Sequence, residues 1–510
     1  MTRPRPLSFA VHLLLAGCAA AAPRPSRPTH ELATVAPAVE VDPDPVPGPD
    51  PEPALSLDCD RELVCRIRRV TERVAAELAA RSDRDAVMVC LRGPSADDLA
   101  TLARVPWLKQ LGIVGFKGGP LELRKVPRLG ELRRLEAGVC HDDVINPPPS
   151  VVADALDRFP RLEAIVLYGK PLSDLAPLRA AVGLREIGLY FPGADLGPMA
   201  GHPTVEKLTL GWGTVSLATL ATLPALRTLS VGAATDAEVA EISKIEHLRD
   251  LALPQAHAKD VSPLGALGAL ERLSISCNHG GYPPPPDGGV ALIPPDFAKL
   301  TRLVELNLDD TGIRDLELLA PLARLRSLKA RTNGITRLDG LASLASLETL
   351  RLDRNPIESL EPLEALAALR ELSLHGTRVT SLAPLAKNGE LRDLLVNGTR
   401  VTSLSSLAKN TRLQRLDVSF TGVTDLGPLV GLKELRRVDF HGTRVRSLRP
   451  LVHLPALRAV GFGANPGLDL TPLAECPALE SVALSAGWDQ IEVLRKMRPG
   501  LDVAGISLHP

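Results

Sequence analysis

Leu303-Val-Glu-Leu306-Asn-Leu308 opens a pattern that returns, with conservative changes, at residues 325, 347, 369, 391, 413, 435, 457 and 479. Each start lies 22 residues after the one before it. A fixed period of this length indicates a solenoid, in which every repeat forms one coil that stacks on the next. We number the first leucine of each coil as position 0, so that apolar residues recur at positions 0, 3 and 5.

The rest of the 22-residue period is equally regular. Positions 0, 3 and 5 predict a short strand whose inward side chains fill the coil. Position 8 carries a polar residue able to satisfy backbone groups at a turn. Further apolar residues follow at positions 10 and 13, and proline at position 15 can begin a short helical return without losing a needed N–H. Examples are Asn333 and Thr377 at position 8, Ile335 and Val379 at position 10, Leu338 and Leu382 at position 13, and Pro362, Pro384, Pro428 and Pro450 at position 15.

These residues closely resemble the leucine-rich repeat family, in the 22-residue class found in bacterial internalins. The resemblance implies an α/β solenoid with a concave parallel β-sheet and short helical or 3-10 turns on the convex side. Less regular coils begin at residues 86, 108, 132, 162, 184, 205, 226, 248 and 270, which gives about 18 coils. We therefore expect a solenoid over 86–487, with an irregular half (86–302) and a regular half (303–487). Residues 146–149 and 279–289 are insertions between coils.

The segments outside the repeats predict export, a tether and two caps. Residues 1–17 read as a signal peptide, and Leu15-Ala16-Gly17-Cys18 resembles the lipobox of bacterial lipoproteins, which implies a lipid on Cys18. Cleavage within residues 19–22 of an ordinary secretory signal is the alternative. Residues 18–56 are rich in Pro and Asp and predict a disordered tether. We expect a helical N-terminal cap at 57–85, with an amphipathic helix over 58–81, and a C-terminal cap at 488–510.

The seven cysteines give few signals of chemistry. Cys59 and Cys65 could form a disulfide if Cys59 precedes the helix, and two free thiols are the alternative. Cys90, Cys277 and Cys476 read as buried small apolar residues. Cys140-His141-Asp142-Asp143 has metal-ligand residue types, but four consecutive residues seldom converge on one ion, so a structural role is favoured.

The sequence predicts no catalytic, cofactor or metal site. The metalloprotease, P-loop, nucleophile-elbow and EF-hand motifs are absent from it. Position 6 presents a polar row on the concave side, which is a secondary candidate for binding. A metal-dependent hydrolase built on His375, Asp417 and His441 is the enzyme alternative, but the two histidines are three coils, roughly 14 Å, apart. The row consists of Asp353, His375, Asn397, Ser419 and His441.

Aromatic residues supply the primary candidate site. They make up only 3% of the chain, yet Tyr168, Tyr190, Phe191 and Trp212 occupy position 6 or 7 of three successive coils. Aromatic side chains gathered on a surface are the usual anchors of protein interfaces. The alternative is that irregular coils take these rings into the core.

From these features we expect a non-enzymatic, monomeric, membrane-tethered binding scaffold for a protein or glycan partner. A net charge of −1 gives no reason to expect nucleic acid. The lipobox resemblance implies the bacterial cell envelope, with Ala19 favouring the outer membrane and secretion as the alternative. A structural envelope component without a specific partner is a further alternative.

Overall fold

The computed structural model describes residues 58–59, 64–67, 70–80, 87–116, 121–140, 143–144, 151–152, 154–169, 175–211, 216–276, 294–463, 468–485 and 488–505. Several predictions therefore fall outside the described residues. They concern the signal peptide with Cys18, the tether, Trp212, the residues 141–142, and the insertions at 146–149 and 279–289.

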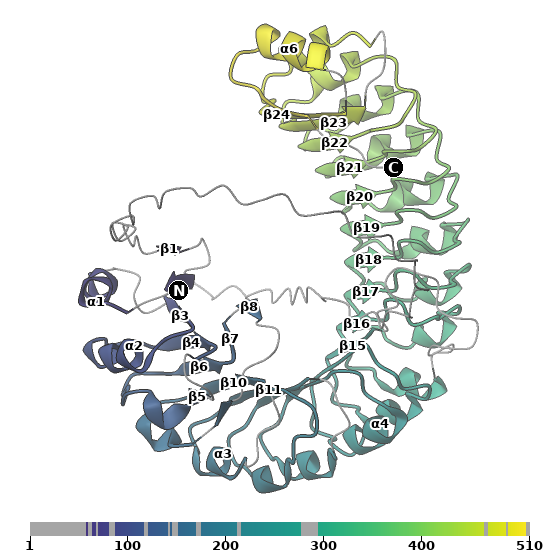
Figure 1. Cartoon of the computed structure of the whole chain (residues 1–510). Coiled ribbons are helices and arrows are strands. Elements are labelled where there is room, and N and C mark those ends of the chain that lie inside the picture. Colours follow the sequence, from purple (N-terminus) through teal and green to yellow (C-terminus); the bar gives the residue numbers. More distant parts are fainter. Residues whose placement is uncertain are drawn as a thin grey trace, which may run out of the picture.

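The protein is a curved solenoid whose inner surface is one long β-sheet (Figure 1). From β2 onward each strand pairs in parallel with the equivalent strand of the next coil, whereas β1 pairs with β2 antiparallel. Every one of the 18 expected coils contributes a strand, so the predicted fold class is confirmed. The strands are β1 (Asp58–Cys59), β2 (Val64–Ile67), β3 (Met88–Arg92), β4 (Gln110–Val114), β6 (Arg134–Ala137), β10 (Ala164–Tyr168), β11 (Glu186–Tyr190), β12 (Lys207–Leu210), β13 (Thr228–Val231), β14 (Asp250–Pro254), β15 (Arg272–Ser276), β16 (Glu305–Asn307), β17 (Ser327–Lys329), β18 (Thr349–Arg351), β19 (Glu371–Ser373), β20 (Asp393–Leu395), β21 (Arg415–Asp417), β22 (Arg437–Asp439), β23 (Ala459–Gly463), β24 (Ser481–Ser485) and β25 (Asp502–Gly505).

The outer surface is built of short helical turns, as the repeat predicts. Most are 3-10 turns of three to five residues, and the proline at position 15 begins several of them, as in η10 and η11. The 3-10 turns are η1 (Leu102–Arg104), η2 (Leu123–Lys125), η3 (Leu156–Arg158), η4 (Gly197–Met199), η5 (Ala218–Thr222), η6 (Ser262–Ala266), η7 (Pro295–Lys299), η8 (Glu317–Leu319), η9 (Asp339–Leu341), η10 (Glu361–Ala365), η11 (Ala383–Lys387), η12 (Ser405–Lys409), η13 (Gly427–Gly431) and η14 (Arg449–His453). The α-helices are α1 (Glu72–Ala79), α2 (Ala96–Thr101), α3 (Ala176–Ala180), α4 (Asp236–Ile242), α5 (Thr471–Glu475) and α6 (Trp488–Met497).

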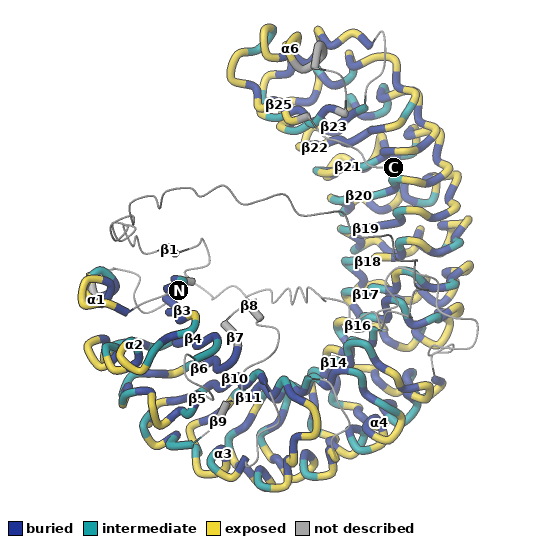
Figure 2. The backbone as a smooth tube through the Cα atoms, viewed as in Figure 1, coloured by how far each residue is buried: buried dark blue, intermediate teal, exposed yellow. Residues whose placement is uncertain are grey.

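The core is a single hydrophobic layer between the sheet and the outer turns, and it continues through the whole arc (Figure 2). Leucines at positions 0, 3 and 5 are almost fully buried, as Leu303, Leu306 and Leu308 illustrate. One coil cannot enclose such a layer by itself, so each coil depends on its neighbours for stability. The outward residues at positions 2, 4 and 6 are thereby held in rows along the concave face.

The expectation of one helix over 58–81 was wrong for its first part. This segment begins with β1 and β2, and only Glu72–Ala79 is helical. Residues 64–67 pair with β3 instead, because the edge of the sheet offers backbone partners that outweigh a local helical spacing. Helix α1 starts where the Thr71 hydroxyl accepts a hydrogen bond from the Val74 N–H at 3.3 Å.

The cysteines differ from the expectation at one position. Cys65 is disulfide-bonded and lies opposite Cys59 in the register of β1 and β2. Cys90 is also disulfide-bonded, so the interpretation of Cys90 as an inert apolar residue was wrong. Cys476 is a buried free thiol, and burial raises its pKa to about 11, which keeps it protonated and unreactive.

Two small sheets accompany the main one. Strand β5 (Leu121–Glu122) pairs with β9 (Val151–Val152), and β7 (Val139–Cys140) forms an antiparallel hairpin with β8 (Asp143–Val144). The hairpin lies on the inner side of the arc, where β7 contacts β4 and β6 (Figure 1). At the other end α6 packs on β25 and α5 with Leu494 buried. None of the helices in the described ranges is long and apolar enough to cross a membrane.

Candidate binding surface on the concave sheet

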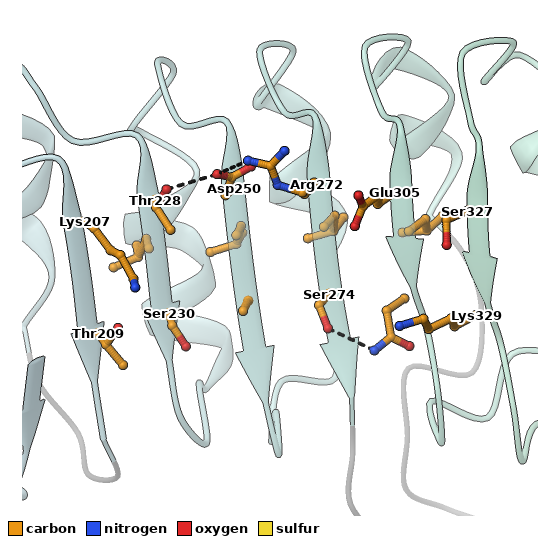
Figure 3. A pocket seen from close by; sticks show the side chains of 16 residues that line it. Lys207, Thr209, Thr228, Ser230, Asp250, Arg272, Ser274, Glu305, Ser327 and Lys329 are labelled. Carbon is orange, nitrogen blue, oxygen red and sulfur yellow. Dashed lines mark hydrogen bonds and ion pairs between the residues drawn. The ribbon is translucent and has the colours of Figure 1, made fainter. Parts of the chain in front are cut away.

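The concave face contains a hollow of about 270 Å³ between β12 and β17 (Figure 3). Its walls are long or charged side chains at position 2, namely Lys207, Asp250, Arg272 and Glu305. Its floor under β12–β15 consists of small residues at position 4, which are Thr209, Ser230, Ala252 and Ser274. Long walls beside a floor of small side chains produce the depression. Asn307, Ser327 and Lys329 close it at β16 and β17.

Part of the hollow is held together by its own polar groups. Arg272 forms an ion pair with Asp250 at 2.6 Å, and the Thr228 hydroxyl donates to the same carboxylate oxygen at 3.0 Å. The Asn307 amide donates to the Ser274 hydroxyl at 3.1 Å (Figure 3). These contacts fix the shape of the walls, which lowers the entropy that a bound partner would have to remove.

Some other polar groups in the hollow form no ion pair or hydrogen bond with the described residues. Neither Lys329 nor Glu305 forms an ion pair with any residue in the described part of the chain. The Oδ1 atom of Asp250 is buried and has no hydrogen-bond partner there either. The Lys329 ammonium can donate and the exposed Glu305 carboxylate can accept, so this hollow offers both a donor and an acceptor to an incoming molecule.

A charged network and two tyrosines continue the surface toward the N-terminus. Glu186 on β11 accepts from Arg134 at 3.2 Å and from Lys207 at 3.0 Å. Burial raises the pKa of Glu186, but the two cations outweigh this effect, and the net pKa is lowered. The tyrosine pair, Tyr168 and Tyr190, lies at the ends of β10 and β11, with ring centroids 6.1 Å apart and planes inclined by 32°.

Tyr190 is half-buried, and its environment holds the phenol in its neutral form. Burial raises the pKa of Tyr190 first, and the negative charges of Glu136 and Glu186 raise it further, against a smaller opposing effect of Arg134. A neutral hydroxyl on a partly exposed ring can both donate a hydrogen bond and contact apolar groups. The tyrosine pair and the hollow therefore lie on one continuous surface across β10–β17.

Comparison with solved structures identifies the architecture. A leucine-rich repeat protein of Leptospira interrogans is similar with a TM-score of 0.55 at 17% sequence identity, over 80% of this chain and 99% of that chain. TLR13 in its complex with ssRNA13 gives 0.51 at 14% identity, over 82% and 76%. The internalin InlF of Listeria monocytogenes gives 0.45 at 21% identity, over 64% and 82%. The protein has the leucine-rich repeat fold.

No protein-family model and no curated protein matches the sequence. The likeness to the solved structures therefore concerns the leucine-rich repeat architecture, and the chemistry of the surface has to be argued from its own residues.

The four aromatic residues predicted as the primary site differ in their positions in the leucine-rich repeat coils. Tyr168 and Tyr190 are brought together, as expected for a surface cluster. Phe191 is only 4% exposed and belongs to the core, so its assignment as a surface anchor was wrong. The left-handed residue of its turn is Gly193, and Phe191 itself keeps an ordinary backbone conformation that turns the ring inward. Trp212 lies outside the described residues.

The N-terminal end of the concave face is closed to partners. Met88, Cys90 and Val114 point to the concave side of β3 and β4 and are nevertheless buried in a small cluster of their own. This is where the β7–β8 hairpin lies against the sheet. The accessible part of the leucine-rich repeat surface therefore begins beyond this hairpin.

The position 6 row is largely engaged in bonds between coils. Asp353 accepts from the His375 N–H at 2.9 Å and from the Ser373 hydroxyl. The ring Nδ1 of His375 lies 2.7 Å from the Asn397 amide nitrogen. Adjacent members are thus brought together, but His375 and His441 belong to β19 and β22 and do not meet.

Ser419 and His441 have structural surroundings as well. The Ser419 hydroxyl accepts from the His441 N–H at 3.1 Å, and the Ser419 N–H donates to Asp417 at 2.9 Å. Burial lowers the pKa of His441, partly offset by Asp439 and Asp417. Among the described residues no three His, Cys, Asp or Glu side chains could hold one metal ion.

The charged and hydroxyl residues of the hollow were not predicted from the sequence. Each is an ordinary outward residue of its coil, and only the contrast between small residues at position 4 and long residues at position 2 would have indicated a depression. That contrast is present in the sequence at β12, β14 and β15, whereas position 2 of β13 is the small Thr228.

Proposed function

We propose that the protein is a non-enzymatic, membrane-tethered scaffold that binds a protein partner on its concave sheet. The observation that carries this proposal is the hollow between β12 and β17, with its fixed walls and its uncommitted Lys329 and Glu305. A rigid, preformed surface loses little conformational entropy when it binds, and the adjacent tyrosine pair supplies the aromatic contacts typical of protein interfaces.

The charge of the hollow favours a polypeptide over a nucleic acid. Lys207, Arg272 and Lys329 are balanced by Asp250 and Glu305 within the same surface. A phosphate backbone is a uniform row of negative charges and is bound by surfaces that are predominantly cationic. TLR13 was solved in complex with ssRNA13, so an RNA ligand is the comparison to make. Mixed charges match the mixed side chains of a protein surface better.

The membrane tether is the second part of the proposal. It rests on the lipobox resemblance at Cys18 and on the proline-rich residues 18–56. The disulfides at Cys65 and Cys90 support an oxidising compartment such as the bacterial envelope, because cytosolic thiols are kept reduced. Radiolabelled palmitate incorporation that is lost in Cys18→Ser tests this part.

The test of binding uses variants that remove charged side chains from the hollow or remove the tyrosine pair. Purified protein captures partners from envelope extracts, and the affinity of each identified partner is then measured for Glu305→Ala/Lys329→Ala and for Tyr168→Ala/Tyr190→Ala. Arg324→Ala, at an exposed arginine that does not line the hollow, is the matched control. We expect at least a tenfold weaker affinity for the hollow variant and no change for the control.

Equal affinity of the hollow variant and the wild type would remove the hollow from the binding site. Loss of affinity in the tyrosine variant alone would restrict the interface to β10 and β11. Absence of any captured protein at several salt concentrations would favour the structural envelope component instead.

A further inference from the structure

An exposed phenylalanine stands on the rim of the regular half, away from the hollow. Phe420 follows β21 at position 7 and is 54% exposed. Position 7 adopts a left-handed backbone in every coil from β16 to β22. Three of its occupants are glycines, Gly376, Gly398 and Gly442, as this conformation favours.

Phe420 is the one large apolar residue at this position among the described coils of the regular half. Its φ of 55° is rarely adopted by a bulky side chain, so the site retains an aromatic residue against the backbone preference. The strained backbone also directs the ring outward, in contrast to Phe191 at position 7 of its own coil. A strained, exposed aromatic residue is an arrangement that packing alone does not require.

The Phe420 ring lies next to a glycine of the following coil. A Cβ atom on Gly442 would approach the Cδ1 atom of Phe420 to 2.6 Å, so the ring leans over this glycine. In the preceding coil the same position is Gly398, which also carries no side chain. The ring thus lies against a position without a side chain, and 54% of the residue remains exposed for contact.

Arginines occupy position 9 of the neighbouring coils, two residues further along the chain than the position of Phe420. Arg378, Arg400 and Arg444 are exposed there, whereas the coil of Phe420 has Gly422. The sequence Gly-Thr-Arg of three coils is therefore replaced by Phe420-Thr-Gly422 in the coil between Arg400 and Arg444. Along the solenoid, the coil that carries Phe420 therefore lies between the coils that carry Arg400 and Arg444.

The backbone holds these residues in a fixed arrangement. The Arg400 N–H donates to the Val379 carbonyl at 2.9 Å, and the Arg444 N–H donates to the Val423 carbonyl at 3.1 Å. The Phe420 N–H donates to the His441 carbonyl at 2.6 Å. The rim is therefore as rigid as the sheet that it borders.

The charge of this rim is predominantly positive. Arg400 and Arg444 form no ion pair with any described residue, and Arg378 has only Glu358 at 3.9 Å. Position 11 is an uncharged threonine in three of these four coils, Thr380, Thr402 and Thr424, and a further arginine, Arg446, in the coil of Arg444. The nearby Asp425 is engaged by the Gly427 N–H at 2.8 Å.

We propose that the Phe420 rim, made of Phe420, Gly398, Gly442, Arg378, Arg400 and Arg444, is a second binding site, which takes an acidic peptide segment bearing an aromatic or large aliphatic side chain. The partner's side chain packs on the exposed part of the Phe420 ring, and its carboxylates pair with Arg400 and Arg444. Aromatic anchors flanked by charges are the usual composition of such sites. A nucleic acid is less suited, because stacking along a single strand uses several aromatic residues in series.

The test uses a random copolymer of glutamate and tyrosine as the probe, with polyglutamate as the probe that lacks the aromatic side chain. The full-length protein should bind the copolymer at least tenfold more tightly than polyglutamate. Phe420→Gly should remove this difference. Arg400→Gln/Arg444→Gln should weaken both probes and flatten the dependence of binding on salt.

Melting temperature separates binding from folding. Glycine suits the left-handed backbone, so Phe420→Gly should melt at the same temperature as the wild type or higher. The controls are Val182→Ala, at an exposed valine far from the rim, and Glu305→Ala/Lys329→Ala in the hollow. Both should bind the copolymer like the wild type, which keeps the two sites distinguishable.

Each of the following results would overturn the proposal. The copolymer could bind Phe420→Gly as well as the wild type, or bind the wild type no better than polyglutamate does. If Phe420→Gly binds the copolymer with unchanged affinity but melts at a lower temperature, the ring serves to stabilise the fold and not to bind a partner. Tighter, Phe420-dependent binding of an oligothymidylate than of the copolymer would replace the peptide by a single-stranded nucleic acid.

Discussion

The regular and irregular halves join one coil to the next with different interactions. In the regular half the strands from β16 to β22 have only three residues. The threonine hydroxyls at position 8 donate to a carbonyl of their own coil, as Thr377 does to Leu374, whereas Asn333 and Asn355 form a buried polar ladder that links their turns. Asn355 shows how it works, since its Oδ1 accepts from the N–H groups of Asn333 and Ile335 at 3.2 and 3.1 Å. Its Nδ2 donates to the Ala330 and Leu352 carbonyls at 2.8 and 2.9 Å.

In the irregular half, the described residues at position 8 are neither asparagine nor threonine. Ala234 and Ala256 occupy position 8 in two of its coils and are buried. The strands of the main sheet are longer there, with four or five residues each from β3 to β15, and Cys65 and Cys90 are disulfide-bonded at the N-terminal end. Longer backbone ladders and covalent bonds thus replace the side-chain ladder.

The difference shows where a repeat protein can vary its surface. A strict period repeats the same turn in each coil, and its outward residues at position 6 become engaged in bonds between coils. The hollow lies where the two halves meet, across β12–β17, and the tyrosine pair lies in the irregular half. The regular half departs from its own pattern at Phe420, where the rim site is proposed.

The largest expected effect tests the covalent part of the comparison. Cys90→Ser removes a disulfide from a fully buried position, and we expect the N-terminal coils to lose about 2–5 kcal/mol of stability. The regular half should be unaffected, because coils interact only with their neighbours. Hydrogen exchange of the amides in β3 and β4, compared with β18 and β19, measures both halves in one experiment. Equal loosening of both would show that the solenoid unfolds as one unit.

The next effect tests the polar ladder. Asn355→Ala leaves the N–H groups of Asn333 and Ile335 and two carbonyls without partners in the core, and we expect a loss of about 2–3 kcal/mol in urea unfolding. Asn355→Thr is the control, because threonine occupies position 8 in Thr377 and bonds the Leu374 carbonyl at 2.8 Å. Asn355→Thr should lose less free energy of unfolding than Asn355→Ala. A negligible loss in Asn355→Ala would mean that the short strands alone hold the regular coils together.

The sequence predicted the fold because the regular spacing of apolar residues determines which side chains form the core of a solenoid. Leucines at positions 0, 3 and 5 must face inward in every coil, and this alone places all 18 strands. The strand β2 could not be found in this way, since residues 64–67 belong to no complete period and pair with β3 only in the folded protein. The disulfide at Cys90 was missed for the same reason, because it depends on proximity in space.

The surface was less predictable, since outward positions carry no periodic constraint. Position 6 faces outward, so Tyr168 and Tyr190 were placed correctly on the concave face. Position 7 depends on the backbone of the turn, and this separates two phenylalanines that the repeat numbering treats alike. Phe191 has an ordinary φ and is buried, whereas Phe420 has a left-handed φ and is exposed. No spacing rule distinguishes the two.

The smallest expected effect is a loss of folding stability at acidic pH, and it should be similar in the two halves. Burial lowers the pKa of His441 in the regular half, against the smaller raising effects of Asp439 and Asp417, and burial also lowers the pKa of His202 in the irregular half. Below about pH 6.5, the ordinary pKa of histidine, the unfolded chain takes up protons that the folded protein does not. Stability therefore falls as pH falls from this value toward the lowered pKa of each residue.

We expect less than about 1 kcal/mol from each histidine, measured by urea unfolding at about pH 7.5 and about pH 5.5. His441→Gln and His202→Gln should each remove part of this acid loss, and because they lie far apart the double variant should remove the sum. His375→Gln is the control, since its ring is half-exposed and hydrogen-bonded to the Asn397 carbonyl at 3.1 Å. A rise of wild-type stability on acidification would contradict the assignment of both buried rings as neutral. If His441→Gln alone removes the loss, acid sensitivity becomes a property of the regular half, and the two halves then differ in their response to acid as well as in how their coils are joined.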